Sequence, residues 1–246
     1  MKKFIVPTLF LCFCFMQTSA QSDFRFGFQT SPTFSWMSTN DNSINGNGTN
    51  LGLKLGLMGE KYFQENYGFT FGINFGFNQG GTLKYQGSGN IWPDVELRQT
   101  FYDLPENTEL KFSLQYLEIP FAFRMRTQEF GYFRYHLDIP SFTLGVLTRA
   151  KGDISTPDGD TTEDEDIRKA VNLLSFGLGL AGGVEYSIGE NISLIGGLGF
   201  QTSLLDVTKD RGTTYITRDD NNVPISGEED SSGKVNVITV RLGILF

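Results

Sequence analysis

The sequence predicts an all-β fold, an eight-stranded antiparallel up-and-down transmembrane β-barrel with short periplasmic turns and long external loops. Three observations predict it: apolar residues that alternate with small or polar ones, short and long connections that alternate along the chain, and a negative charge confined to the long connections. The aromatic content of 14% beside a mean hydropathy of −0.19 suits strands that are apolar on one face.

Residues 1–20 are predicted to be a signal peptide that directs secretion. Lys2 and Lys3 precede an apolar run, Phe4–Met16, which leads into small residues up to Ala20. This run is too short to span a membrane as a helix. We therefore expect a single outer-membrane β-barrel domain over residues 21–246.

Removal of the signal peptide changes two properties of the chain. The two cysteines, Cys12 and Cys14, leave with it, so no disulfide or thiolate chemistry is expected. Because Lys2 and Lys3 are lost, the formal charge changes from −8 to −10. An acidic chain of this kind disfavours nucleic acid as a partner.

Alternation with a period of two identifies the strands. Leu51–Met58 alternates leucine with Gly, Lys or Met, and Tyr67–Asn78 alternates large apolar residues with Gly, Thr or Asn. In a helix, the three glycines inside Tyr67–Asn78 would each cost about 1 kcal/mol relative to alanine. Leu117–Arg126 and Ile238–Phe246 alternate in the same way. The predicted strands are 24–36, 50–63, 67–80, 113–127, 137–149, 171–187, 192–207 and 234–246.

The connections between these strands decide the architecture. They are short at 64–66 and 189–191, modest at 128–136, and long after the first, third, fifth and seventh strands. This alternation is typical of an outer-membrane barrel, and an even number of strands leaves both termini in the periplasm. Each strand exceeds the roughly 9 to 11 residues that cross the hydrocarbon layer at a tilt.

The long connections carry the whole charge imbalance. The loops 37–49, 81–112, 150–170 and 208–233 have formal charges of −1, −2, −4 and −3. A secreted soluble β-sandwich or lipocalin-like barrel, the main alternative, has no reason to place its charge on alternate connections. The terminal Phe246 also favours the membrane barrel, because a last strand that ends on an aromatic residue resembles the signal read by barrel-insertion machinery.

The segment Leu114-Gln115-Tyr116-Leu117-Glu118-Ile119-Pro120 resembles the Tyr-Leu-Glu-Ile-Pro strand of PorT-like outer-membrane β-barrel proteins from Bacteroidetes. Phe142–Leu147 and Phe176–Tyr186 are similar to that family in kind and order, although Ile139-Pro140-Ser141 replaces its usual Gly-Pro-Tyr. The resemblance implies an eight-stranded barrel in the outer membrane. Since the family's namesake is tied to a protein-secretion apparatus, secretion or envelope proteins are expected partners, beside outer-membrane lipid and the barrel-insertion machinery.

The small and polar face of the predicted strands should line the lumen. An eight-stranded barrel is just wide enough for side chains to fill, so charges there are expected to pair and plug it. A proton or solute path is the alternative. The charged residues predicted to face the lumen, five positive and three negative, are Arg25, Lys54, Glu60, Glu118, Arg124, Arg126, Glu185 and Arg241.

The third long loop is strongly acidic but lacks the glycine and glutamate spacing of an EF-hand. A solvated acidic face is the simplest interpretation. Weak binding of divalent cations and binding of a basic partner are the alternatives. The weak metal candidates are Asp158, Asp160, Glu163, Asp164 and Asp166.

No catalytic residue and no cofactor are predicted. The single histidine, His136, falls at the periplasmic start of the fifth strand, whereas hydrolytic sites of small barrels lie towards the external rim. The predicted function is therefore a non-enzymatic outer-membrane barrel with a filled lumen and acidic external loops, in an interaction or accessory role in envelope assembly or protein secretion. A lipid-modifying outer-membrane enzyme and a narrow porin are the alternatives.

Aromatic residues gather near the predicted strand ends, where interfacial girdles belong. Trp36 is predicted at the external girdle. Trp92 lies deep in the second long loop and is expected to nucleate a folded loop or to make a contact. The predicted periplasmic girdle comprises Tyr62, Phe63, Tyr67, Tyr132, Phe133, Tyr135 and Tyr186.

Overall fold

A computed structural model describes residues 24–97, 101–189, 192–209, 211–218, 224–228 and 230–246. The predicted signal peptide lies outside the described residues. Within the part of the chain that is described, no helix is long and apolar enough to cross a membrane.

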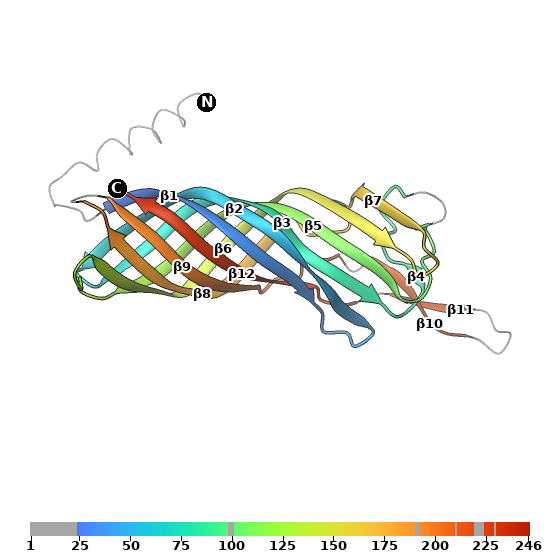
Figure 1. Cartoon of the computed structure of the whole chain (residues 1–246). Coiled ribbons are helices and arrows are strands. Elements are labelled where there is room, and N and C mark those ends of the chain that lie inside the picture. Colours follow the sequence, from blue (N-terminus) through green and yellow to red (C-terminus); the bar gives the residue numbers. More distant parts are fainter. Residues whose placement is uncertain (1–23, 98–100, 190–191, 210, 219–223, 229) are drawn as a thin grey trace, which may run out of the picture.

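Eight antiparallel strands close into a ring (Figure 1). Consecutive ring strands pair with each other, and the ring closes where the first strand pairs with the last. This confirms the predicted eight-stranded up-and-down barrel, whose closed wall leaves no open edge. The ring strands are β1 (Phe24–Ser38), β2 (Ile44–Gln64), β3 (Tyr67–Tyr85), β5 (Thr108–Arg126), β6 (Phe133–Ser155), β8 (Leu174–Ser187), β9 (Ser193–Ser203) and β12 (Lys234–Leu245).

Within the described residues, four short strands lie outside the ring. β4 (Gly89–Asn90), β10 (Thr213–Arg218) and β11 (Pro224–Glu228) form a small sheet of their own, and β7 (Thr161–Asp166) pairs with β6. Figure 1 shows all four at one end of the barrel, opposite the start of β1 and the C-terminus. We call these two ends the loop end and the terminal end.

The wall is taller than the sequence predicted, because parts of three predicted long loops belong to ring strands, and β6 already begins at Phe133, inside the predicted connection 128–136. β2 begins within 37–49, β3 and β5 extend into 81–112, and β6 extends into 150–170. The reason is that apolar side chains such as Leu83, Leu110 and Ile154 continue to face inward, and each is fully buried. Conversely, the predicted strands 171–187 and 192–207 are too long, since β8 begins at Leu174 and β9 ends at Ser203.

The outer face of the ring carries exposed apolar side chains, as an amphipathic transmembrane wall requires. The predicted terminal-end girdle is present on this face in six of its seven members. Tyr62 is the exception: its side chain faces inward and is 7% exposed, and its hydroxyl lies 3.3 Å from Glu60 Oε2. The remaining, exposed members are Phe63, Tyr67, Tyr132, Phe133, Tyr135 and Tyr186.

We expect the folded chain to migrate differently on a denaturing gel before and after boiling. A closed ring satisfies its backbone hydrogen bonds internally, so detergent does not unfold it until it is heated. The measurement compares unheated and boiled samples of the purified chain. A single band at one position under both conditions would contradict a stable closed barrel.

Candidate functional site

The lumen is the candidate functional site, because its lining changes in character from the terminal end to the loop end. The lining comes from the inward side chains of all eight ring strands. It consists of a charged cluster near the terminal end, a small polar cavity in the middle and an apolar plug at the loop end.

Arg25 on β1 begins the charged cluster by joining two carboxylates. Its Nε donates to Glu60 Oε1 on β2 at 2.6 Å. Its Nη1 and Nη2 donate to the two carboxylate oxygens of Glu185 on β8 at 2.5 and 2.8 Å. Such charge-assisted, bidentate hydrogen bonds are strong and hold the guanidinium in one orientation. Arg25 therefore connects β1 with β2 and β8.

Arg124 and Arg241 continue the cluster around Asp138. Arg124 is 2% exposed and donates through Nε and Nη2 to both oxygens of Asp138, at 2.6 and 2.8 Å, and through Nη1 to Glu60 at 2.7 Å. Arg241 on β12 donates to Asp138 Oδ2 at 2.6 Å. The cluster is therefore one unbroken chain of ion pairs, Glu185–Arg25–Glu60–Arg124–Asp138–Arg241, which joins β8, β1, β2, β5, β6 and β12.

Lys54 and Glu118 form a separate inward pair, with Nζ 2.8 Å from Oε2. Adding this pair to the six-residue cluster gives four cations and four carboxylates. The sequence predicted five cations and three carboxylates for the lumen. The structure adds Asp138 and leaves Arg126 out, so each of these eight charges has a partner of opposite sign. Arg134 on β6 also reaches this cluster from the terminal rim, with its Nη1 3.9 Å from Glu185 Oε1 and its Nη2 paired with Glu129.

Asp138 is the cluster member that sequence reasoning missed. The pairing of β6 with β8 changes register between Asp138 and Ser141, which is a β-bulge. On the loop-end side of the bulge the outward residues are Leu144 and Val146; on the terminal side they are Leu137 and Ile139. Alternation extended from Val146 would place Asp138 outward. The local alternation Leu137-Asp138-Ile139, in which two apolar residues flank the aspartate, indicates that Asp138 faces the lumen.

Arg126 does not join the cluster. Its guanidinium carbon lies 3.5 Å from the centre of the Tyr62 ring, and its Nε donates to the backbone oxygen of Glu65. This is a cation–π contact at the terminal rim. The predicted network is therefore corrected by one residue lost and one gained, while Arg25, Lys54, Glu60, Glu118, Arg124, Glu185 and Arg241 make the inward pairs described above.

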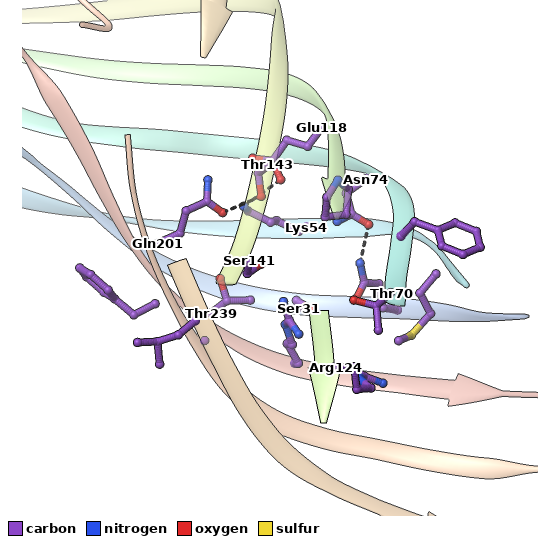
Figure 2. A pocket seen from close by; sticks show the side chains of 18 residues that line it. Ser31, Lys54, Thr70, Asn74, Glu118, Arg124, Ser141, Thr143, Gln201 and Thr239 are labelled. Carbon is purple, nitrogen blue, oxygen red and sulfur yellow. Dashed lines mark hydrogen bonds and ion pairs between the residues drawn. The ribbon is translucent and has the colours of Figure 1, made fainter. Parts of the chain in front are cut away.

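A polar cavity of about 60 Å³ separates the charged cluster from the loop end. Figure 2 shows that its lining residues converge from several strands, with a dashed contact joining Thr143 to Gln201. Gln29 Nε2 donates to Asn74 Oδ1 at 2.5 Å. Ser31 is 1% exposed, and its hydroxyl has no hydrogen-bond partner among the described residues. A cavity of this size and polarity suits a few ordered waters and is too small for an organic substrate.

An apolar plug fills the loop end of the lumen. Trp92, in the connection between β4 and β5, is 3% exposed, and its ring meets Phe112 edge to face at 5.4 Å between centroids. Gly152 on β6 leaves the space for it, because a Cβ there would lie 2.5 Å from the indole. Trp92 is therefore packed inside a folded loop, in agreement with the expectation from the sequence. The plug comprises Met37, Ile44, Leu83, Tyr85, Ile91, Trp92, Val95, Leu97, Phe101, Leu104, Leu110, Phe112, Leu114, Tyr116, Leu147, Ala150, Ile154, Ile167, Val171, Val207, Val235 and Val237.

The acidic third loop is largely folded against β6. Asp153 accepts from Lys111 Nζ at 3.0 Å and from the backbone N–H of Asp164, a residue in the left-handed region with φ of 60°. Hydrogen bonds from Arg168 hold the pKa of Asp166 below its ordinary value.

The weak metal candidates Asp158 and Asp160 are exposed in the turn between β6 and β7, and Glu163 is exposed on β7. Asp164 and Asp166 have the contacts given above. Within the described part of the chain, no three His, Cys, Asp or Glu side chains come together as a group that could hold a metal ion.

His136 and Phe246 both lie at the terminal end. His136 is buried and faces the lumen, and neither ring nitrogen has a hydrogen-bond partner among the described residues. Phe246 pairs with β1 through two backbone hydrogen bonds to Phe26, and its ring stands edge to face against Phe28 at 6.0 Å. The role of Phe246 as an insertion signal stays a prediction.

We expect Asp138→Asn to lower the free energy of unfolding by about 3–5 kcal/mol, because it removes the counter-charge that the buried Arg124 shares with the partly buried Arg241. Equilibrium unfolding by urea in lipid vesicles measures the change. Arg126→Gln, which alters a cation outside the cluster, is the control and should have a much smaller effect. Equal losses in the two variants would contradict the central position of Asp138.

We expect Trp92→Ala to destabilise the plug by about 3–5 kcal/mol, the usual range for removing a large buried aromatic side chain. Amide hydrogen exchange should become faster in β4 and in the flanking residues 91–97, while the exchange of the terminal-end strands stays slow. Trp36→Phe, on the outer wall, is the control. Unchanged exchange at the loop end in Trp92→Ala would show that the plug does not depend on Trp92.

The family described as outer membrane protein β-barrel domain matches residues 15–209. Among curated protein sequences, none matches the chain. Neisserial surface protein A is 12% identical to this chain with a TM-score of 0.40. The match covers 89% of this chain and 95% of that protein. A major outer membrane protein from Thermus thermophilus is 12% identical with a TM-score of 0.41. Its match covers 91% of this chain and 98% of that protein.

Ail, the attachment invasion locus protein of Yersinia pestis, is 10% identical with a TM-score of 0.36, covering 90% of this chain and 98% of its own. These solved structures are distant likenesses. The family match is the decisive finding, because it spans most of the chain and agrees with the eight-stranded ring. The chain belongs to the outer membrane protein β-barrel family, and its place is the outer membrane.

Proposed function

We propose that this protein is a closed, non-enzymatic outer-membrane barrel that presents a folded acidic platform outside the cell and serves an interaction or accessory role in envelope assembly or protein secretion. In this proposal both termini are periplasmic and the loop end is external. The observation that carries it is the double closure of the lumen, by the ion-pair cluster near one end and by the apolar plug at the other.

The closed lumen argues against a narrow porin. A solute would have to break a chain of ion pairs in which Glu60 and Asp138 are fully buried, and then displace the plug around Trp92. Both steps carry large costs, because breaking a buried pair exposes an uncompensated charge and opening a packed core creates cavities.

The position of His136 argues against a hydrolytic enzyme. It is the single histidine of the chain, and its ring is buried at the terminal end beside the ion pairs rather than at an open rim. The small polar cavity offers no room for a lipid or a peptide.

The loop end supplies the surface for a partner. Beyond the ring lie β4, β7, β10 and β11, braced by ion pairs such as Arg211–Asp94 at 2.7 Å. A cleft there is lined by acidic and basic side chains together: Asp94, Glu96, Glu165, Asp166, Arg168, Lys169 and Lys209. Folded, charged surfaces of this kind recognise partners through complementary charge.

A role close to that of PorT-like proteins is the finer form of this proposal. The Tyr116–Pro120 run that carries the resemblance lies where the lumen changes from apolar to polar: Tyr116 belongs to the plug, and Glu118 pairs with Lys54. This run therefore has a structural purpose in the barrel. Affinity capture from detergent-solubilised envelopes with a tagged chain tests whether secretion or envelope proteins are its partners.

We expect no steady single-channel current from the purified protein in planar bilayers, because both closures must open for ions to pass. Glu118→Gln should also give no conductance, since it leaves the terminal cluster and the plug intact. A known porin in the same bilayers is the control for insertion and recording. Large, steady currents from the unmodified chain would overturn the closed-lumen proposal.

We expect the combined variant Asp158→Asn, Asp160→Asn and Glu163→Gln to bind a basic partner at least tenfold more weakly, because it removes three exposed carboxylates from the platform. Point substitutions are used instead of a loop deletion, because the segment 153–166 includes Ile154, which belongs to the plug. Binding to polylysine-coated beads at rising salt is the measurement, and Glu65→Gln, an exposed carboxylate at the terminal end, is the control. Unchanged binding would show that these carboxylates only solvate the loop.

A further inference from the structure

The loop-end half of β6 contains a β-bulge that turns an arginine outward. In the pairing with β5, Tyr116 lies opposite Leu147 and Gln115 opposite Arg149, so Thr148 is the extra residue. Leu147 and Ala150 both face inward and belong to the apolar plug. Thr148 and Arg149 are consecutive and are both exposed on the outer wall.

The bulge decides where Arg149 points. Inward residues of β6 run Ser141, Thr143, Gly145 and Leu147, so an unbroken strand would send Arg149 inward next. That position lies inside the plug, where an unpaired charge is strongly disfavoured. The extra residue moves Arg149 outside and lets Ala150 continue the apolar lining.

Arg149 stands just above the apolar band of the wall. On β6 this band runs from Leu137 to Val146, and Leu174 pairs with Val146 on the neighbouring strand. Nine residue steps of about 3.3 Å at a tilt near 40° give a band roughly 23 Å high, close to the ~25 Å of outer-membrane barrels. Arg149 is three residues beyond Val146, which places it in the lipid headgroup layer.

On the β5 side the surroundings of Arg149 are polar, and its charge is uncompensated within the described residues. Gln115 lies directly opposite it on β5, and Ser113 lies opposite Lys151 in the next outward pair. Among the described residues no carboxylate pairs with Arg149, whereas the neighbouring Lys111 is already paired with Asp153. We call Ser113, Gln115, Thr148, Arg149 and Lys151 the Arg149 shelf.

We propose that the Arg149 shelf binds the phosphate-bearing headgroup of a membrane lipid, with the lipid's acyl chains along Leu144, Val146 and Leu174. A guanidinium can donate two parallel hydrogen bonds to one phosphate, and the Gln115 amide and the Ser113 hydroxyl add further donors. Lys151 Nζ already donates to the backbone oxygen of Asp164, so Lys151 contributes its positive charge beside these donors. The strands hold these groups in place before the lipid arrives, which lowers the entropic cost of binding. The assignment rests on the proposed function only in naming the outer leaflet as the source of the lipid.

Native mass spectrometry of the full chain in neutral detergent tests the proposal, with diphosphorylated lipid A and dephosphorylated lipid A of the same acyl composition as the two probes. We expect the unmodified chain to bind the phosphorylated form at least tenfold more tightly, with an affinity that falls as salt rises. Arg149→Gln should remove this preference, and Arg149→Lys should retain only part of it, because an ammonium offers a point charge in place of a fork.

Lys61→Gln, which removes an exposed cation at the terminal end of β2, is the matched control and should leave the preference intact. The heat-dependent gel shift confirms that each variant is folded. Equal binding of the two lipids by the unmodified chain, or an unchanged preference in Arg149→Gln, would overturn the proposal. Because the shelf lies on the outer wall, channel activity of the protein would contradict the proposed function without affecting this result.

Discussion

The need to fill a narrow ring is the constraint on which the rest of this structure depends. A closed barrel of eight strands satisfies its backbone hydrogen bonds but encloses an interior that must be packed or hydrated. The chain of ion pairs through Arg25, Glu60, Arg124 and Asp138 fills the terminal half and joins six of the eight ring strands. Because each buried charge has a partner of opposite sign, the cluster avoids the cost of isolated charges in a low-dielectric interior.

The loop-end half of the lumen is filled by apolar side chains. The lining changes from charged to apolar along individual strands. Along β5, Arg124, Glu118, Tyr116 and Phe112 all point inward, so one strand face passes from charged to apolar between Glu118 and Phe112. The apolar part rises above the outer apolar band, where a barrel surrounded by water rather than lipid needs a core of its own. The loop end therefore resembles a small soluble domain built on a membrane wall, and its packed core supports the charged surface above it.

β-bulges set which side chains serve the lumen and which serve the outer surface. The bulge between Asp138 and Ser141 turns Asp138 into the ion-pair cluster, and the bulge at Thr148 turns Arg149 out of the plug. Since successive residues of a strand face opposite sides, one extra residue exchanges the two faces for everything beyond it. β6 contains two such bulges, so its inward side chains belong in turn to the charged cluster, the polar cavity and the apolar plug.

The sequence by itself determined the fold class, the eight ring strands and most of the inward charges, because period-two alternation and connection length are local properties of the chain. Glu60, Glu118 and Arg124 could be assigned to the lumen in this way. The alternation Leu137-Asp138-Ile139 indicates that Asp138 faces inward, but the tertiary structure alone decided that Asp138 pairs with both Arg124 and Arg241. It also decided that Arg126 contacts the ring of Tyr62 and that segments predicted as loops form the wall and plug. The physical reason is that a bulge depends on the register between two strands, and burial depends on what closes over a side chain from distant segments. Neither property is present in any short stretch of sequence.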